Sequence, residues 1–116
     1  MNFDFIGLKS LNQVIAFIST GAMDKDKTKI IMGLIVESLR EGLGMSRYAL
    51  AKESGVDYAW LRRFEKGTSG IRVETLILLA RGLKIPAGTI VTAIEKALDN
   101  PDKWLDEYEK NKKATS

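Results

Sequence analysis

Apolar residues recur at steps of three and four positions along most of the chain. No segment alternates apolar with polar residues over the length of a strand, so the pattern predicts an all-α protein. Glycines, prolines and capping residues divide the pattern into segments. The predicted helices run over residues 28–41, from Ser46 to a turn at Gly55, from Asp57 to Gly67, over residues 73–81 and from Pro86 to Leu98, with a further amphipathic helix after Asn100 and Pro101.

Each predicted helix carries an apolar stripe that would face a common core. Gly42 and Gly44 are expected to end the first helix, and Gly82 the fourth. One side of the last helix carries Trp104, Leu105 and Tyr108. The expected core residues of the first five helices are Ile31, Leu34, Ile35, Leu39, Leu50, Ala51, Leu61, Phe64, Leu76, Leu79, Ala80, Ile90, Val91, Ile94 and Leu98.

The chain divides into three parts. Residues 27–98 hold five predicted helices, and residues 99–116 hold the C-terminal amphipathic helix and a tail. Residues 1–26 are an N-terminal arm, a helix for dimer formation or a non-native extension. The last alternative is considered because the sequence 21–23 resembles a cloning junction. The apolar stripe in this first part consists of Leu8, Leu11, Ile15 and Ile18.

Composition excludes several classes of protein. The chain has no cysteine and no histidine, which removes disulfides, zinc fingers and catalysis by a cysteine or histidine. We therefore expect no enzymatic activity, no metal and no cofactor. The longest apolar run, residues 30–36, is far shorter than the ~20 residues of a membrane span, and no secretory signal is evident. The expected location is the cytoplasm, with no membrane contact.

Positive charge is concentrated in the middle of the chain. Residues 27–98 contain twelve lysines and arginines against seven acidic residues, a net charge of +5. The two flanking parts carry −1 each, which gives the total of +3. A basic central module is typical of proteins that bind polyanions such as nucleic acid.

The most informative motif runs from Ser46 to Gly67. Two short helices that cross at a steep angle need a small residue at their contact, which Ala51 provides. Gly55 supplies a turn conformation that is strained for other residues, and apolar side chains fill the angle between the helices. The side chains expected to fill it are Val56, Leu61 and Phe64.

This motif resembles the helix-turn-helix of the Cro/C1-type (Xre-like) DNA-binding family. The matching residues are Ser46, Leu50, Ala51, Gly55, Val56, Leu61, Glu65, Gly67, Thr75, Leu76, Ala80 and Leu83. The resemblance implies a lambda-repressor-like domain of five helices that binds double-stranded DNA, and an ion pair between Arg40 and Glu65. The chain departs from the family pattern at Arg47 in place of glutamine, at Trp60 in place of a small polar residue and at Ile71 in place of proline.

The reading face of the motif follows from helix geometry. At about 100° per residue, Leu61 and Phe64 fall on one side of the helix that begins after Asp57, and the basic residues fall on the other. The residues expected to read bases, from this rotation and from the resemblance, are Tyr58, Ala59, Arg62 and Arg63. The residues expected to contact phosphate are Ser46, Arg47, Lys66, Thr68 and Arg72.

The sequence thus favours a transcriptional regulator, specifically a repressor that binds an inverted-repeat operator as a homodimer. Two alternatives stay open. One is an antitoxin that regulates its own expression through the same motif, with a toxin as its protein partner. The other is a protein-interaction module that has lost DNA binding; an antirepressor is a further possible partner.

Overall fold

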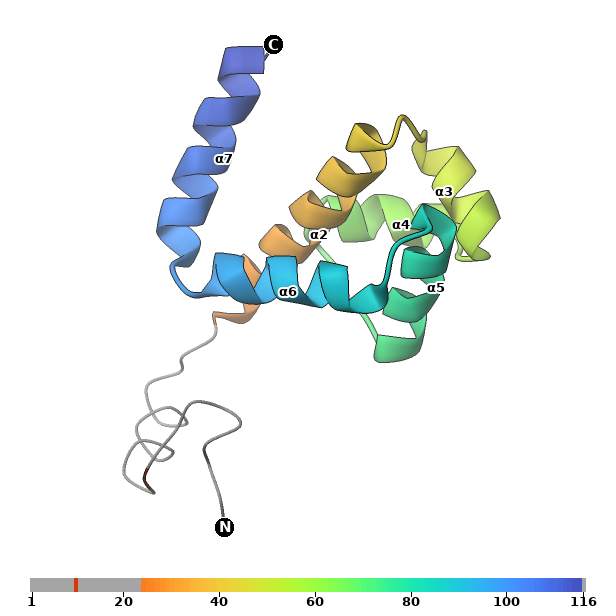
Figure 1. Cartoon of the computed structure of the whole chain (residues 1–116), viewed down its shortest axis with the longest axis horizontal. Coiled ribbons are helices and arrows are strands. Elements are labelled where there is room, and N and C mark those ends of the chain that lie inside the picture. The colour runs from red at the N-terminus through yellow and green to blue at the C-terminus, as the bar shows by residue number, and fades with distance from the viewer. Residues whose placement is uncertain (1–9, 11–23, 116) are drawn as a thin grey trace.

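The computed structural model describes residue 10 and residues 24–115, which form six helices and no strand (Figure 1). Five helices belong to the expected domain, and the sixth is the expected C-terminal amphipathic helix, so residues 24–115 contain one helix more than the family domain. The apolar stripe predicted before Gly21 lies outside the described residues. The helices are α2 (Lys25–Gly42), α3 (Arg47–Ser54), α4 (Tyr58–Glu65), α5 (Val73–Leu83), α6 (Ala87–Leu98) and α7 (Pro101–Thr115).

Helix α2 begins earlier than its apolar pattern predicts. The carboxylate of Asp24 accepts hydrogen bonds from the backbone N–H groups of Asp26 and Lys27, at 3.0 and 3.1 Å. Asp24 is therefore an N-cap, and the charged residues that follow it form the first turn of α2. The pattern missed this turn because its residues are polar and make no contribution to the apolar stripe.

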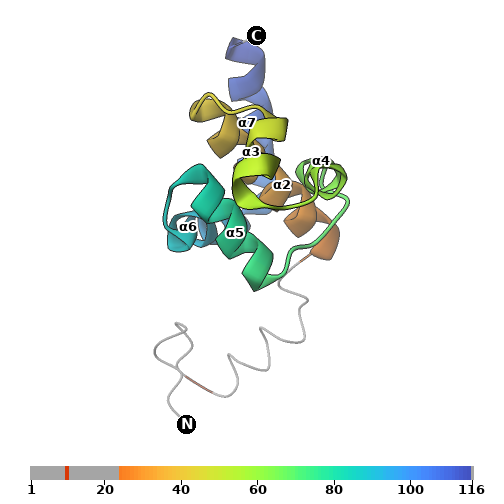
Figure 2. The same ribbon diagram turned by 90° about the vertical axis from the view of Figure 1, so that its right-hand side faces the viewer.

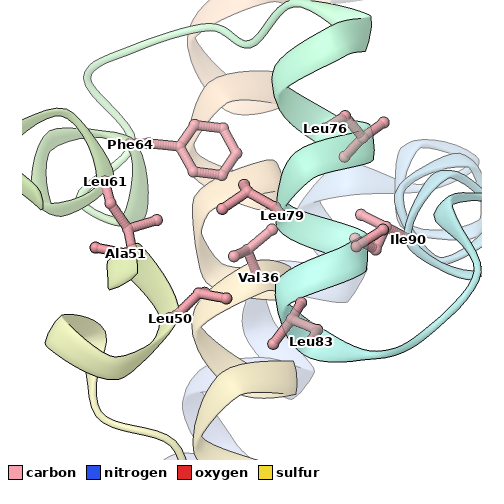
Figure 3. Packing of buried hydrophobic residues seen from close by; sticks show 10 residues of the cluster. Val36, Leu50, Ala51, Leu61, Phe64, Leu76, Leu79, Leu83 and Ile90 are labelled. Carbon is pink, nitrogen blue, oxygen red and sulfur yellow. The ribbon is translucent and has the colours of Figure 1, made fainter. Parts of the chain in front are cut away.

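The main core is formed by α2 to α6 (Figure 3). Two residues expected in the core are not part of it: Leu34 on α2 is only half-buried and Val91 on α6 is 47% exposed. The fully buried residues nearby are Val36 in the main core and Ala97 in the second cluster described below. The buried residues of the main core are Val36, Leu50, Ala51, Leu61, Phe64, Leu76, Leu79, Ala80, Leu83 and Ile90.

Gly82 does not end α5 as predicted. The helix continues to Leu83, and Lys84 takes the left-handed conformation with φ of 59°. Gly82 is instead a contact point with α3, because a Cβ there would lie 2.9 Å from the Cβ of Ser54 and 3.1 Å from Leu50 Cδ1. The glycine allows close packing of the two helices, and the turn that follows is made by a lysine.

The C-terminal helix α7 packs on the domain. Ile31 and Ile35 of α2 and Ala97 of α6 form a second buried cluster, which Trp104 and Leu105 of α7 cover. Lys27 Nζ lies 2.7 Å from Asp102 Oδ1 at the start of α7. The far end of α7 projects away from the domain (Figure 1).

Within the described part of the chain, no single helix is both long enough and apolar enough to cross a membrane. The pair α5 and α6 meets the length and composition requirements only together, and the chain bends by 112° between them.

Candidate nucleic-acid interface

Helices α3 and α4 form the predicted helix-turn-helix. Figure 2 shows α3 in front of α2, with α4 on one side and α5 on the other. The turn between α3 and α4 contains Gly55 with φ of 76°, a left-handed conformation that costs other residues steric energy. Ser46 Oγ accepts a hydrogen bond from Ala49 N at 3.0 Å, and Asp57 Oδ2 accepts one from Trp60 N at 2.9 Å. Each helix is thus fixed at its N-terminus by the capping residue that the sequence predicts.

Helix α4 has a buried side and an exposed basic side. Leu61 and Phe64 are completely buried, as is the side chain of Glu65. The opposite side is exposed and forms a shallow depression on the surface. The residues that line this depression are Tyr58, Ala59, Arg62, Arg63 and Lys66. All four residues expected to read bases therefore share one exposed surface.

The loop after α4 is fixed to that helix by side-chain hydrogen bonds. Thr68 Oγ1 donates to the carbonyl oxygen of Arg63 at 3.0 Å. Trp60 Nε1 donates to Ser69 Oγ at 3.2 Å, and the Trp60 ring stacks on Phe64 with centroids 5.1 Å apart. Trp60 therefore packs at the edge of the core and also joins α4 to the loop that precedes α5.

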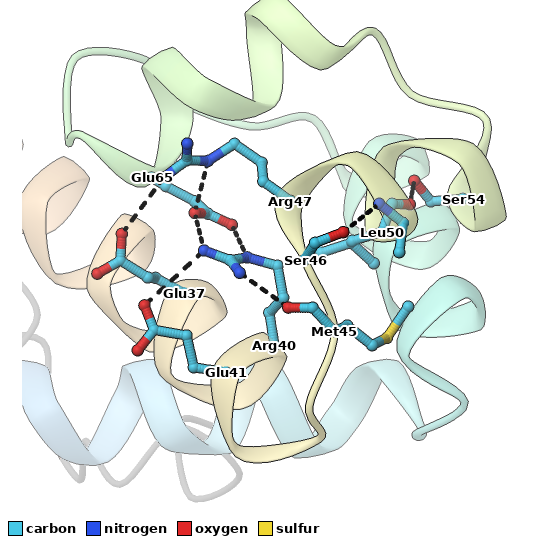
Figure 4. A network of polar contacts seen from close by, with 10 residues as sticks. Glu37, Arg40, Glu41, Met45, Ser46, Arg47, Leu50, Ser54 and Glu65 are labelled. Carbon is cyan, nitrogen blue, oxygen red and sulfur yellow. Dashed lines mark hydrogen bonds and ion pairs between the residues drawn. The ribbon is translucent and has the colours of Figure 1, made fainter.

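Arg40 and Glu65 form a forked contact between α2 and α4 (Figure 4). Arg40 Nε donates to Glu65 Oε2 at 2.8 Å, and Arg40 Nη2 donates to Glu65 Oε1 at 2.9 Å. Arg40 Nη1 donates to the carbonyl oxygen of Met45 at 2.9 Å. The hydrogen bond to Glu65 raises the pKa of Arg40. Because both side chains are buried, this contact holds the last turn of α4 on α2.

Arg47 also binds Glu65. Its side chain is therefore directed into the protein, whereas a phosphate contact is expected to be directed outward. Its Nε donates to Glu65 Oε1 at 3.0 Å, and its Nη2 lies 3.8 Å from Glu37 Oε2 (Figure 4). Only 25% of the Arg47 side chain is exposed. Burial lowers the pKa of Arg47, but hydrogen bonds to Glu65 and Tyr58 outweigh it and raise the pKa.

The other residues expected to contact phosphate have different environments. Lys66 and Arg72 are exposed, on either side of the loop between α4 and α5. Arg72 is the N-cap residue of α5 but makes no side-chain capping bond. Thr68 is engaged through both its hydroxyl and its backbone N–H, which donate to the carbonyl oxygen of Arg63. The Ser46 hydroxyl accepts a bond from Ala49 N and can still donate its own proton to a phosphate.

Sequence reasoning missed two residues of this site. Glu37 is a partner of Arg47. The pKa of Glu37 is raised mainly by burial and, to a smaller extent, by the negative charges of Glu65 and Glu41. Gly33 lies beneath the end of α4, where a Cβ would collide with the carbonyl oxygen of Phe64. The signal for Gly33 was its place in the middle of a strong helix pattern, where glycine is unfavourable without a packing reason.

Solved structures of regulators share this arrangement of helices. The clp gene regulator ClgR from Corynebacterium glutamicum is 18% identical, with a TM-score of 0.60 over 71% of this chain and 87% of its own. The restriction-modification controller protein C.AhdI from Aeromonas hydrophila is 26% identical, with a TM-score of 0.51 over 53% of this chain and 92% of its own. The restriction-modification controller protein C.Esp1396I is 19% identical, with a TM-score of 0.55 over 60% of this chain and 91% of its own.

The sequence matches no curated protein. Residues 36–90 match the helix-turn-helix family. This segment begins in the second half of α2 and ends at Ile90 in α6, so it includes both helices of the motif and the helices that pack on them. Residues 36–90 are therefore a helix-turn-helix domain of the Cro/C1 (Xre-like) type.

Proposed function

We propose that this protein is a transcriptional regulator that binds a specific sequence of double-stranded DNA. The observation that carries the proposal is the exposed side of α4, where Tyr58, Ala59, Arg62 and Arg63 lie together while Leu61 and Phe64 anchor the helix from behind. An α-helix fits the major groove, and an arginine can pair with guanine through two hydrogen bonds there. The family of the domain supports the same function.

The proposed phosphate contacts flank this reading face. Lys66 and Arg72 are exposed at the loop after α4, and the capped N-terminus of α3 presents backbone N–H groups. Such contacts orient a protein on the duplex and carry no sequence information of their own. They also make binding strongly dependent on salt, because each neutralised phosphate releases counterions.

The proposed active form is a homodimer on an inverted repeat, with one α4 helix in each half-site. Half-sites one helical turn apart, about 34 Å, would place both recognition helices on one face of the duplex. The outer surfaces of α5 and α6 expose Val73, Ile77 and Val91, which are candidate contacts for the second copy. We propose repression as its effect, because a bound dimer can exclude polymerase without any further contact.

The test is selection of bound duplexes from a random DNA pool, followed by mobility-shift titrations over a range of salt concentrations. We expect an enriched inverted repeat and an association constant that falls steeply as salt rises. A promoter carrying that repeat should lose reporter expression when the protein is present. Retention of no DNA, or retention that does not depend on salt, would favour a protein-interaction module instead.

A further inference from the structure

Arg47 is the first residue of α3, and its side chain is directed into the protein. Its guanidinium contacts carboxylates from two other helices, Glu65 of α4 at 3.0 Å and Glu37 of α2 at 3.8 Å. Arg47 therefore connects the start of α3 with the end of α4 and the middle of α2. Nε and Nη2 are thereby directed to carboxylates inside the protein, and only 25% of the side chain is exposed to an approaching phosphate.

The charges around Glu65 favour the inward position of Arg47. Glu65 Oε1 accepts hydrogen bonds from both Arg40 and Arg47, and the Glu65 side chain is completely buried. Glu37, with 18% of its side chain exposed, balances the second positive charge. Removing one partner from such a buried network leaves an uncompensated charge, which costs more than an exposed contact with phosphate would return.

Arg47 also lies beside the proposed reading face. Tyr58 and Glu65 are seven residues apart, which places them on the same flank of α4, between its buried and its exposed side. A hydrogen bond with the Tyr58 phenol contributes to the raised pKa of Arg47. The guanidinium is thus bonded to Glu65 in the last turn of α4 and is influenced electrostatically by Tyr58 in the first turn.

We propose that Arg47 is a positioning residue, which fixes the orientation of α4 on α3 through the buried carboxylate of Glu65 and does not bind phosphate. The proposal rests on the proposed function, because the orientation of α4 decides how its side chains meet the bases. Residues that read bases need to be held within about 0.5 Å of their productive positions. Loss of Arg47 should therefore affect selectivity rather than the general attraction to DNA.

The contact itself is tested without DNA. Urea unfolding is measured for the wild type, Arg47→Gln, Glu65→Gln and the double variant. We expect the double variant to unfold at a higher urea concentration than the sum of the two single effects predicts, because each single change strands the partner. Additive shifts of the midpoint would show that the two side chains do not interact and would overturn the proposal.

The role in reading is tested with the selected operator and with unrelated DNA, at a temperature where circular dichroism shows every variant to be folded. For Arg47→Gln we expect the ratio of specific to nonspecific affinity to fall about tenfold. The slope of log K against log salt should not change. Arg47→Lys should not restore selectivity, because an ammonium group cannot reproduce the fork of a guanidinium.

Lys66→Gln serves as the control for loss of a phosphate contact. The slope of log K against log salt should become less steep by about one in this variant. A similar fall for Arg47→Gln, reversed in Arg47→Lys, would show that Arg47 binds phosphate and would overturn the proposal. Unchanged selectivity in both Arg47 variants would also overturn it, since the role would then be structural only. Wild-type protein that binds no DNA would instead contradict the proposed function, and the unfolding experiment would still decide the contact between Arg47 and Glu65.

Discussion

Gly33 lies directly beneath the carbonyl oxygen of Phe64, and this contact sets how closely α4 approaches α2. A Cβ at position 33 would collide with that oxygen and would lie 2.9 Å from the carbonyl oxygen of Glu65. The last turn of α4, which carries Arg62 and Arg63 on its other side, therefore rests on a helix surface with no side chain.

The first prediction follows from this contact. Gly33→Ala should destabilise the fold by about 1–3 kcal/mol, because the new Cβ, fixed to the backbone of α2, would collide with a backbone oxygen of α4 and neither atom can rotate away. Gly42→Ala is the matched control in the same helix, since a Cβ there has nothing within 4 Å. Urea unfolding followed by circular dichroism measures both. A Gly33→Ala variant as stable as Gly42→Ala would show that the two helices can separate at no cost.

The second prediction concerns the two arginines on Glu65. Glu65→Met leaves Arg40 and Arg47 with only the more distant carboxylates of Glu41 and Glu37, at 3.9 and 3.8 Å, whereas Arg40→Met leaves Glu65 still bound by Arg47. We expect Glu65→Met to lower the free energy of unfolding by about 3–5 kcal/mol and Arg40→Met to lower it by less. The double variant Arg40→Met/Glu65→Met should be more stable than the sum of the two effects predicts. The shared network would be contradicted if the two single variants lost the same free energy of unfolding and the double variant lost the sum of the two.

The third prediction concerns the reading face. Arg62→Ala and Arg63→Ala should each weaken binding to the selected operator by about 1–3 kcal/mol and relax the preference at one base pair. Lys66→Ala should weaken binding to all sequences alike. Lys96→Ala, which removes the same charge from the exposed surface of α6, is the control and should have little effect. If both arginine variants bind the operator as tightly as wild type, the reading face is assigned to the wrong residues.

The fourth prediction concerns the turn between α5 and α6. Lys84 is exposed and has φ of 59°, a conformation that costs a residue with a Cβ about 1 kcal/mol relative to glycine. Lys84→Gly should therefore raise the free energy of unfolding by up to about that amount. Lys96→Gly, in the last turn of α6, should lower it by up to about 1 kcal/mol, because glycine is less favourable than lysine in a helix. Thermal unfolding of the two variants should shift in opposite directions.

The fifth prediction concerns the N-terminal part. Deletion of residues 1–22 keeps Asp24, the N-cap of α2, and should leave a helical domain that unfolds cooperatively. Deletion of residues 1–27 also removes that cap and Lys27, the partner of Asp102, so it should be less stable by about 1 kcal/mol. Circular dichroism and light scattering compare the two truncated proteins. Loss of folding in the shorter deletion would place the domain boundary before residue 23.

The local features of the fold were open to prediction because they depend on residues close in sequence. Ser46 and Asp57 cap their helices with the N–H groups three residues ahead, and Gly55 makes its turn within a single residue. The apolar spacing of α4 also determined which of its sides is exposed, since a helix turns by a fixed angle per residue. The partner of Arg40 came from the family resemblance rather than from spacing.

Tertiary contacts decided what the sequence alone did not determine. Gly82 has the sequence signature of a helix end, but the approach of Ser54 and Leu50 makes it a packing position. Arg47 is charged and sits at a helix start, which are also the properties of a phosphate contact. Its direction depends on Glu37 and Glu65, ten positions before it and eighteen after it, which come together only when α2, α3 and α4 pack. Local patterns therefore fix the helices and their faces, whereas the partners of buried charges depend on contacts between residues distant in the chain.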